Sequence, residues 1–293
     1  MPGYRLIENS VEFVETSDFF DKVALVAHNC YQVKDKGHES NVDFVKRLIS
    51  SGHLAMIEHY RFFFEVDSRH YDLFKKLYNP YFFLLEDKGH YYLSCSLRPL
   101  LEAKEGLEKE LSAYISSALP VEISSLLPYE KSEERPLLLN LETLKKTLDA
   151  SNYRRFRFVT YHLITDRGVT HEIVRHRPCS FAQESTRYCN YTKDKFSNEL
   201  AFMKPLAYDE HKDIYDRFFQ NTSDTYFALI EKGEKPDEAR AVLPNSLKAS
   251  IMVSATLEEW NHIFELRCSE FAHPDIRRLM ILVRDDLGKR ETL

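Results

Sequence analysis

One stretch organises this 293-residue sequence: residues 175–187 read RHRPCSFAQESTR. It belongs to a longer segment, residues 151–190, that holds seven arginines and no lysine. Lysine would serve for general solubility, whereas the planar guanidinium fork grips a phosphate or carboxylate through two bonds in one orientation. The segment therefore predicts an oxyanion ligand. Two alternatives are a set of solvated surface arginines with internal salt bridges, and a nucleic-acid groove in which nearby aromatic residues stack on bases.

The residues around this stretch predict its local structure. The segment from Phe156 to Ile164 is predicted to form a strand. A short helix is expected from about Val169, and Pro178 forces it to stop near His176. Residues 180–188 have no clear period and are interpreted as a loop, the kind of segment that commonly carries binding residues.

The rest of the chain predicts a mixture of helices and strands without regular βαβ alternation. We therefore expect an α+β fold, a mixed sheet with packed helices, in a single domain covering residues 1–293. Helices are predicted near 17–27, 43–49, 209–232, 257–268 and 274–287, and strands near 60–66, 81–85, 91–95 and 249–255. Residues 86–89 are predicted to form a hairpin turn between the strands at 81–85 and 91–95.

Composition limits the possible classes of protein. A formal charge of −6 argues against general attraction to nucleic acid. The chain starts with no signal-type apolar segment and contains no apolar run near the roughly 20 residues that cross a bilayer, so we expect a cytoplasmic protein without a membrane partner. The five cysteines lack CxxC spacing, which predicts mostly buried free thiols and no metal site.

Several familiar catalytic motifs are excluded by spacing. His171 and His176 stand five residues apart, not the four that place two zinc ligands on one helical face. Cys179 has no evident activating base, and Ser185 is not in a GxSxG turn. No P-loop or GxGxxG is present, so any nucleotide must be bound in another way.

Four ordered motifs carry a family resemblance. RHR at 175–177 is followed, after seven residues, by Ser185; the others are SGHLAMIEH at 51–59, ARAVLP at 239–244 and WNHIFELR at 260–267. In these features the chain resembles the flavin-dependent thymidylate synthases, the thymidylate synthase complementing protein family. The resemblance covers about two thirds of the chain, and residues 80–150, mostly helical in pattern, look like an insertion.

The resemblance implies a reaction and its partners. The family methylates dUMP reductively to dTMP with 5,10-methylenetetrahydrofolate, and FAD relays hydride from NADPH. Its fold is α+β, and its members are homotetramers whose active sites lie between subunits. The competing hypothesis is a non-catalytic nucleotide- or RNA-binding protein that keeps the phosphate grip.

The resemblance also assigns residues. Arg187 and Arg240 would hold the dUMP phosphate, Ser185 would lie at the pyrimidine, and Arg267 would lie at the uracil edge and favour its ionised form. Ser185 and Arg267 are the catalytic candidates, although no covalent enzyme nucleophile is implied. The full dUMP set is Glu172, Arg175, Gln183, Glu184, Ser185, Thr186, Arg187, Arg240 and Arg267. The FAD set is His53, Ala55, Glu58, Arg175, His176, Arg177, Gln183, Thr256 and His262.

Some of these positions depart from the family pattern. Glu172 stands where glutamine is frequent, Ala55 where serine or threonine often contacts the flavin, and Thr256 and His262 where asparagine can occur. A carboxylate facing uracil would repel the ionised base unless Arg175 or protonation neutralised Glu172.

Overall fold

A computed structural model describes residues 3–32, 35–130, 132–193 and 196–291 of the chain. Its centre is a four-stranded antiparallel sheet with strand order β2-β7-β10-β8. The strands are β2 (Ser10–Phe13), β7 (Phe158–Asp166), β8 (Ser180–Gln183) and β10 (Lys248–Thr256). Strands β7 and β10 pair over nine residues and join segments that are far apart in the sequence.

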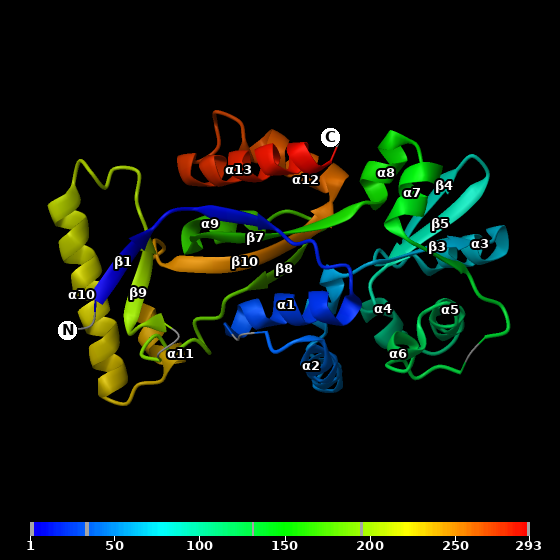
Figure 1. The fold of residues 1–293 in the computed structure, drawn as a ribbon, viewed down its shortest axis with the longest axis horizontal. Helices are drawn as coiled ribbons and strands as arrows, with labels where there is room; N and C mark the ends of the chain where they lie inside the picture. The colour runs from blue at the N-terminus through cyan, green and yellow to red at the C-terminus, as the bar shows by residue number, and fades with distance from the viewer. Residues whose placement is uncertain (1–2, 33–34, 131, 194–195, 292–293) are drawn as a thin grey trace.

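Helices cover both faces of this sheet (Figure 1). One face carries α9 (Arg167–Ile173), α12 (Leu257–Arg267) and α13 (Pro274–Arg290), and the other carries α1 (Phe19–Tyr31), with α2 (His38–Ser50) packed against α1. On α12, Leu257, Trp260 and Phe264 are buried, as their helical spacing predicts. Trp260 packs edge-on against Tyr161 of β7, with ring centroids 5.5 Å apart.

A second antiparallel sheet, with order β4-β5-β3-β6, lies at the other end of the molecule (Figure 1). Its β4–β5 hairpin confirms the predicted turn: Lys88 and Gly89 have φ of 52° and 81°, the left-handed backbone of a tight hairpin turn. The strands are β3 (Phe62–Val66), β4 (Phe83–Asp87), β5 (His90–Cys95) and β6 (Leu137–Leu139); the helices of this region are α3 (Ser68–Leu77), α4 (Arg98–Leu101), α5 (Leu107–Ser116), α6 (Val121–Ser124), α7 (Leu141–Thr147) and α8 (Ala150–Phe156).

The third sheet is a parallel pair of β1 (Gly3–Ile7) and β9 (Glu199–Met203), and the long helix α10 (Lys212–Glu231) packs against both strands. Beside α10 lie α11 (Pro236–Ala239) and the 3-10 turn η3 (Arg240–Val242); a second 3-10 segment, η1 (Leu54–His59), packs against α1 and β8. The predicted mixture of helices and strands is confirmed, but the strands form three small sheets instead of one mixed sheet.

Two local predictions need correction. Residues 180–183 form the edge strand β8, not a loop; four residues are too few to show a period, and their pairing with β10 is a long-range contact. The predicted strand from Phe156 begins instead at Phe158, and α9 ends at Ile173, so Arg175 and His176 follow that helix.

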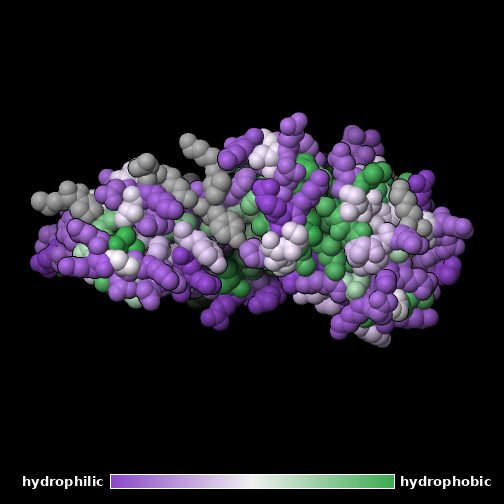
Figure 2. Space-filling model, turned by 90° about the horizontal axis from the view of Figure 1, so that it is seen from below, coloured by the Kyte–Doolittle hydropathy of each residue, from purple (hydrophilic) through white to green (hydrophobic). Residues whose placement is uncertain are grey.

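The surface and the thiols complete the description. Figure 2 shows a largely hydrophilic face with hydrophobic residues gathered to the right of its centre. Within the described ranges, no helix is both long and apolar enough to cross a membrane. No cysteine forms a disulfide among the described residues, and Cys30, Cys95 and Cys189 are buried.

Candidate active site

The centre of the candidate site is a contact between the ends of two helices on the same face of the sheet. Asp166 caps α9 by accepting a hydrogen bond from the Val169 backbone at 2.6 Å, and the helix then presents Glu172. Arg267 lies in the last turn of α12. Its Nη1 donates to Glu172 Oε2 at 2.9 Å, and its Nε donates to His176 Nε2 at 3.0 Å.

The bond from Arg267 fixes the protonation of His176. Because Arg267 can only donate, His176 Nε2 must be the unprotonated nitrogen, and the neutral ring carries its proton on Nδ1. Burial and the positive charge of Arg267 lower the pKa of His176 to about 4, so the ring stays neutral at physiological pH. Arg267 is therefore the fixed positive charge of this cluster.

The same contact settles how Glu172 is neutralised. We predicted that Arg175 or protonation would do this, but the partner is Arg267, whose Nη2 also reaches the Glu172 carbonyl oxygen at 3.4 Å. The Arg175 side chain is exposed and makes no ion pair with any residue of the described ranges. Glu172 therefore shares the guanidinium that the resemblance places at the uracil edge.

The chain after β8 passes close to this cluster. Gln183, the last residue of β8, donates through Nε2 to Thr170 Oγ1 on α9 at 3.0 Å. Ser185 follows, its backbone nitrogen bonded to the Cys30 carbonyl at 3.2 Å and its Oγ accepting from the Arg187 backbone nitrogen at 3.3 Å. Of these residues, Gln183 thus contacts α9, whereas Ser185 is bonded to the end of α1, which covers the other face of the sheet.

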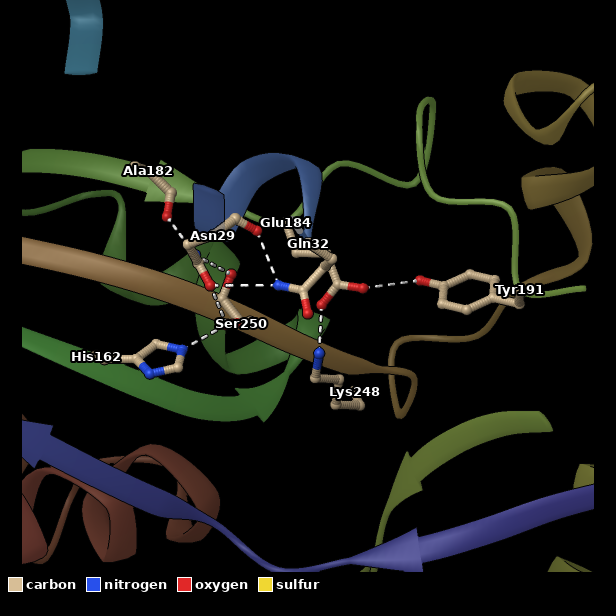
Figure 3. Close-up of polar contacts among 8 residues, drawn as sticks. All are labelled: Asn29, Gln32, His162, Ala182, Glu184, Tyr191, Lys248 and Ser250. Carbon is tan, nitrogen blue, oxygen red and sulfur yellow. Dashed lines mark hydrogen bonds and ion pairs between the residues drawn. The ribbon is translucent and has the colours of Figure 1, made fainter. Parts of the chain in front are cut away.

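Glu184 differs from what we expected of a substrate ligand. Its side chain is only 4% exposed and turns into the protein, where Lys248 Nζ lies 2.5 Å from Oε2 and the Tyr191 hydroxyl lies 3.4 Å from Oε1 (Figure 3). Thr186 is also buried. These two residues can reach a ligand in this segment through their backbone, not through free side chains.

A buried polar network continues from Glu184 beneath the sheet edge (Figure 3). Asn29 of α1 donates to the carbonyls of Ala182 and Ser250 at 3.1 and 3.2 Å, and Ser250 Oγ in turn contacts His162 Nε2 at 2.6 Å. The sequence did not reveal this network, because its members come from separate elements. A lysine at the start of the largely buried strand β10 was the one local signal.

Three arginines of the segment at 175–187 have exposed side chains. The guanidinium groups of Arg175, Arg177 and Arg187 form no ion pair or hydrogen bond with another described residue; that of Arg187 lies 5.5 Å from the Tyr188 ring centroid. Arg240 is also exposed, and its Nε donates to the Asp237 carbonyl at 3.1 Å. Cations without carboxylate partners are suited to an anionic ligand.

Arg240 lies on η3, which packs against α10 and α11 beside the two-stranded sheet. The neighbouring Ala239 and Val242 share a hydrophobic cluster with Cys189 and Tyr191, which follow Arg187 in the chain. No hydrogen bond or ion pair among the described residues joins Arg240 to residues 183–187.

The residues predicted to contact a flavin occupy two places. His53 and Ala55 are exposed before and within η1, while Glu58 Oε1 accepts from Arg98 Nη1 at 2.5 Å. Thr256 caps α12 by accepting from the Glu259 backbone at 3.2 Å, and the exposed His262 lies on the same helix with its ring 6.5 Å from that of His176. The exposed Arg175 and Arg177 supply cationic groups compatible with a pyrophosphate.

The structure bears on the alternatives from the sequence. Burial raises the pKa of the Cys179 thiol to about 12, so this group is not a thiolate at neutral pH. Of the aromatic residues considered for stacking, Phe156 and Tyr191 are buried, and Tyr188 is 59% exposed. Asp18, Asp21 and His38 have ligand atoms within 4.8 Å of one another, but Asp21 and His38 bond each other at 3.1 Å.

Two other arginines of segment 151–190 have structural partners. Arg157 Nε lies 2.7 Å from Glu291 Oε1, and Arg155 Nε lies 3.8 Å from Glu258 Oε2. The surface-arginine alternative thus describes one part of the segment, while the arginines at 175–187 remain without carboxylate partners among the described residues.

Comparisons with known proteins show the family to which the chain belongs. The sequence model described as "Thymidylate synthase complementing protein" matches residues 115–290. The chain is 34% identical over 115 residues to a flavin-dependent thymidylate synthase of Geobacter sulfurreducens, covering 39% of this chain and 49% of that protein. It is 31% identical over 130 residues to one of Pyrococcus furiosus, covering 43% and 52%. The chain thus spans about half the length of these relatives. The family model matches more than half of the chain, so this protein belongs to the thymidylate synthase complementing protein family.

Proposed function

We propose that this protein is a flavin-dependent thymidylate synthase, a methyltransferase that converts dUMP to dTMP with 5,10-methylenetetrahydrofolate, FAD and NADPH. The observation that carries the proposal is the cluster of Arg267, Glu172 and His176 beside the segment that ends at Arg187. A charged guanidinium next to a neutral imidazole provides a site where negative charge on a pyrimidine is stabilised.

The nucleotide would lie along residues 183–187. Arg187 would bind its phosphate, and Arg240 of another subunit would complete the grip, as expected for active sites shared between subunits. The pyrimidine would then meet Ser185 and Arg267. Each charge-assisted bond contributes roughly 1.5 to 3 kcal/mol, so loss of either phosphate arginine should weaken dUMP binding about tenfold or more.

The flavin would be held by Arg175, Arg177 and His53, with Glu58, Thr256 and His262 close to its ring or chain. Bound FAD supplies hydride transfer, with NADPH as the source of the hydride. The protein residues hold and orient the two ligands and exclude water from the contact between them. A homotetramer with shared sites, a cytoplasmic location and one catalytic domain with an insertion near 80–150 belong to the same proposal.

Colour tests the proposal directly. The purified chain, reconstituted with FAD, should show a flavin absorption band that bleaches when NADPH is added without oxygen. A chain that binds dUMP yet never binds FAD would instead support the non-catalytic nucleotide-binding alternative.

The shared site has its own test. Arg187→Ala and Arg240→Ala chains, each weakened in dUMP binding alone, should regain part of the wild-type affinity when they are mixed and reassembled, since some sites then contain neither substitution. Mixed tetramers that bind dUMP no more tightly than either variant alone would contradict the shared phosphate grip.

A further inference from the structure

A cavity of about 1140 Å³ is lined by none of the proposed nucleotide and flavin residues, although His59 in its lining directly follows Glu58 in the chain. One wall is formed by the β2–α1 connection, the first residues of α1 and the chain entering β3. The opposite wall is formed by residues 138–142, which belong to the predicted insertion. The cavity thus lies between the central sheet and the second sheet.

Two cations line this cavity without a carboxylate partner. Lys22 is 6% exposed, and its Nζ makes one hydrogen bond, to the Val14 carbonyl at 3.3 Å. The Arg61 guanidinium lies 4.6 Å from the Phe158 ring centroid and forms no ion pair or hydrogen bond with any other described residue. Because neither group has a carboxylate partner, an anion bound in the cavity would be stabilised by the Arg61 charge and would favour the protonated form of the buried Lys22.

A third polar group in the cavity is also unsatisfied. His59 is 1% exposed; its Nδ1 contacts Ser254 Oγ at 2.6 Å, but its Nε2 has no hydrogen-bond partner among the described residues. Burial and Lys22 lower the pKa of His59 to about 3, so it is neutral and offers a hydrogen-bonding nitrogen, not a charge.

The acidic residues that line the cavity are already engaged. Glu291 pairs with Arg157 at 2.7 Å and Glu15 pairs with Arg290 at 2.6 Å. Of the other two, Glu142 lies 3.7 Å from Lys146, while Asp18 caps α1 and lies 3.7 Å from His38 Nδ1. None of these carboxylates pairs with Lys22 or Arg61 in the described structure.

The remaining lining contains both aromatic and aliphatic side chains. Phe13, Tyr60, Phe62 and Phe158 line the cavity, and Arg61 already lies over one of these rings. Aromatic walls favour a flat apolar body, while buried cations favour an oxyanion attached to it.

We propose that this cavity is a second ligand site, which binds an aromatic oxyanion with its carboxylate or phosphate between Lys22 and Arg61 and its ring among the aromatic residues. The site is separate from the proposed nucleotide site. It joins the central sheet to the insertion, so a ligand there contacts both parts of the chain.

Calorimetric titration of the full chain tests this site with four probes: 1-naphthyl phosphate, 1-naphthoate, neutral 1-naphthalenemethanol and inorganic phosphate. At least one aromatic anion should bind tenfold or more tightly than both the neutral alcohol and inorganic phosphate. Comparison of the two anions distinguishes phosphate from carboxylate. Equal binding of the neutral alcohol, or no binding of either anion at millimolar concentration, would overturn the proposal.

Two substitutions test whether the probe binds in the cavity. Lys22→Met and Arg61→Met should each weaken binding about tenfold, whereas Lys109→Met, an exposed change on α5, should leave it unchanged. Saturating dUMP should not displace the probe. Wild-type affinity in both cavity variants, with thermal unfolding showing that they are folded, or displacement by dUMP, would refute the assignment.

Discussion

The contact between Glu172 and Arg267 leads to a prediction about substrate affinity. In the proposed site, the carboxylate competes with the pyrimidine for the same guanidinium and repels an ionised ring. Glu172→Gln keeps the shape of the side chain and an oxygen acceptor but removes the negative charge. We therefore expect this variant to bind dUMP more tightly than the wild type does.

The magnitude follows from the geometry. A charge-assisted hydrogen bond such as the 2.9 Å contact to Arg267 contributes roughly 1.5 to 3 kcal/mol, and a neutral one about 0.5 to 1.5 kcal/mol. The side chains of Arg267 and Glu172 are 23% and 35% exposed, so solvent screens part of the difference. A gain of about 1 kcal/mol remains, which is roughly fivefold in the dissociation constant.

The assay is calorimetric titration of dUMP into the FAD-loaded chain at pH 7.5. Glu265→Gln provides a matched control, because it removes an equal charge from an exposed position on α12, two residues before Arg267. The control should bind dUMP as the wild type does. Weaker binding in Glu172→Gln, or an equal change in both variants, would show that the carboxylate does not compete with the ligand.

Three further predictions concern the site and the cavity. Arg267→Met should lower kcat by about 100-fold or more while changing the Kd for dUMP far less, since its charge acts where negative charge develops; steady-state kinetics alongside calorimetry would reveal an equal loss of both instead. Cys179→Ala and Ser185→Ala should each retain measurable dTMP synthesis, and complete loss with FAD still bound would indicate a covalent nucleophile. Burial lowers the pKa of Lys22 from 10.5 to about 7. Between pH 7 and pH 10.5 the unfolded chain therefore binds more protons than the folded chain, and the free energy of unfolding rises with pH by up to about 1.4 kcal/mol per pH unit. Urea unfolding at pH 7 and 8.5 should show a gain about 2 kcal/mol larger in the wild type than in Lys22→Met, and equal gains would contradict the buried charge.

The sequence predicted the elements that are determined by contacts between residues close together in the chain. The stripe of Leu257, Trp260 and Phe264 predicted the buried face of α12, and turn residues between two apolar runs predicted the β4–β5 hairpin. In both cases adjacent residues supply the determining contacts, so the sequence pattern is sufficient.

Long-range contacts determine the features that the sequence did not predict. Strand β8 exists because residues 180–183 pair with β10, about 70 residues later in the chain, and no local period signals that pairing. The same holds for the ion pair of Glu184 with Lys248, which turns a predicted ligand side chain inward. The link between Arg267 and Glu172 also depends on tertiary packing, although both residues were expected at the site.

Tritium release from [5-³H]dUMP tests the central claim most directly. The chain supplied with FAD, NADPH and 5,10-methylenetetrahydrofolate should release tritium to water and form an equal amount of dTMP. Omission of FAD should abolish both products. A folded, FAD-loaded chain that binds dUMP but releases no tritium with all components present would contradict the proposed function.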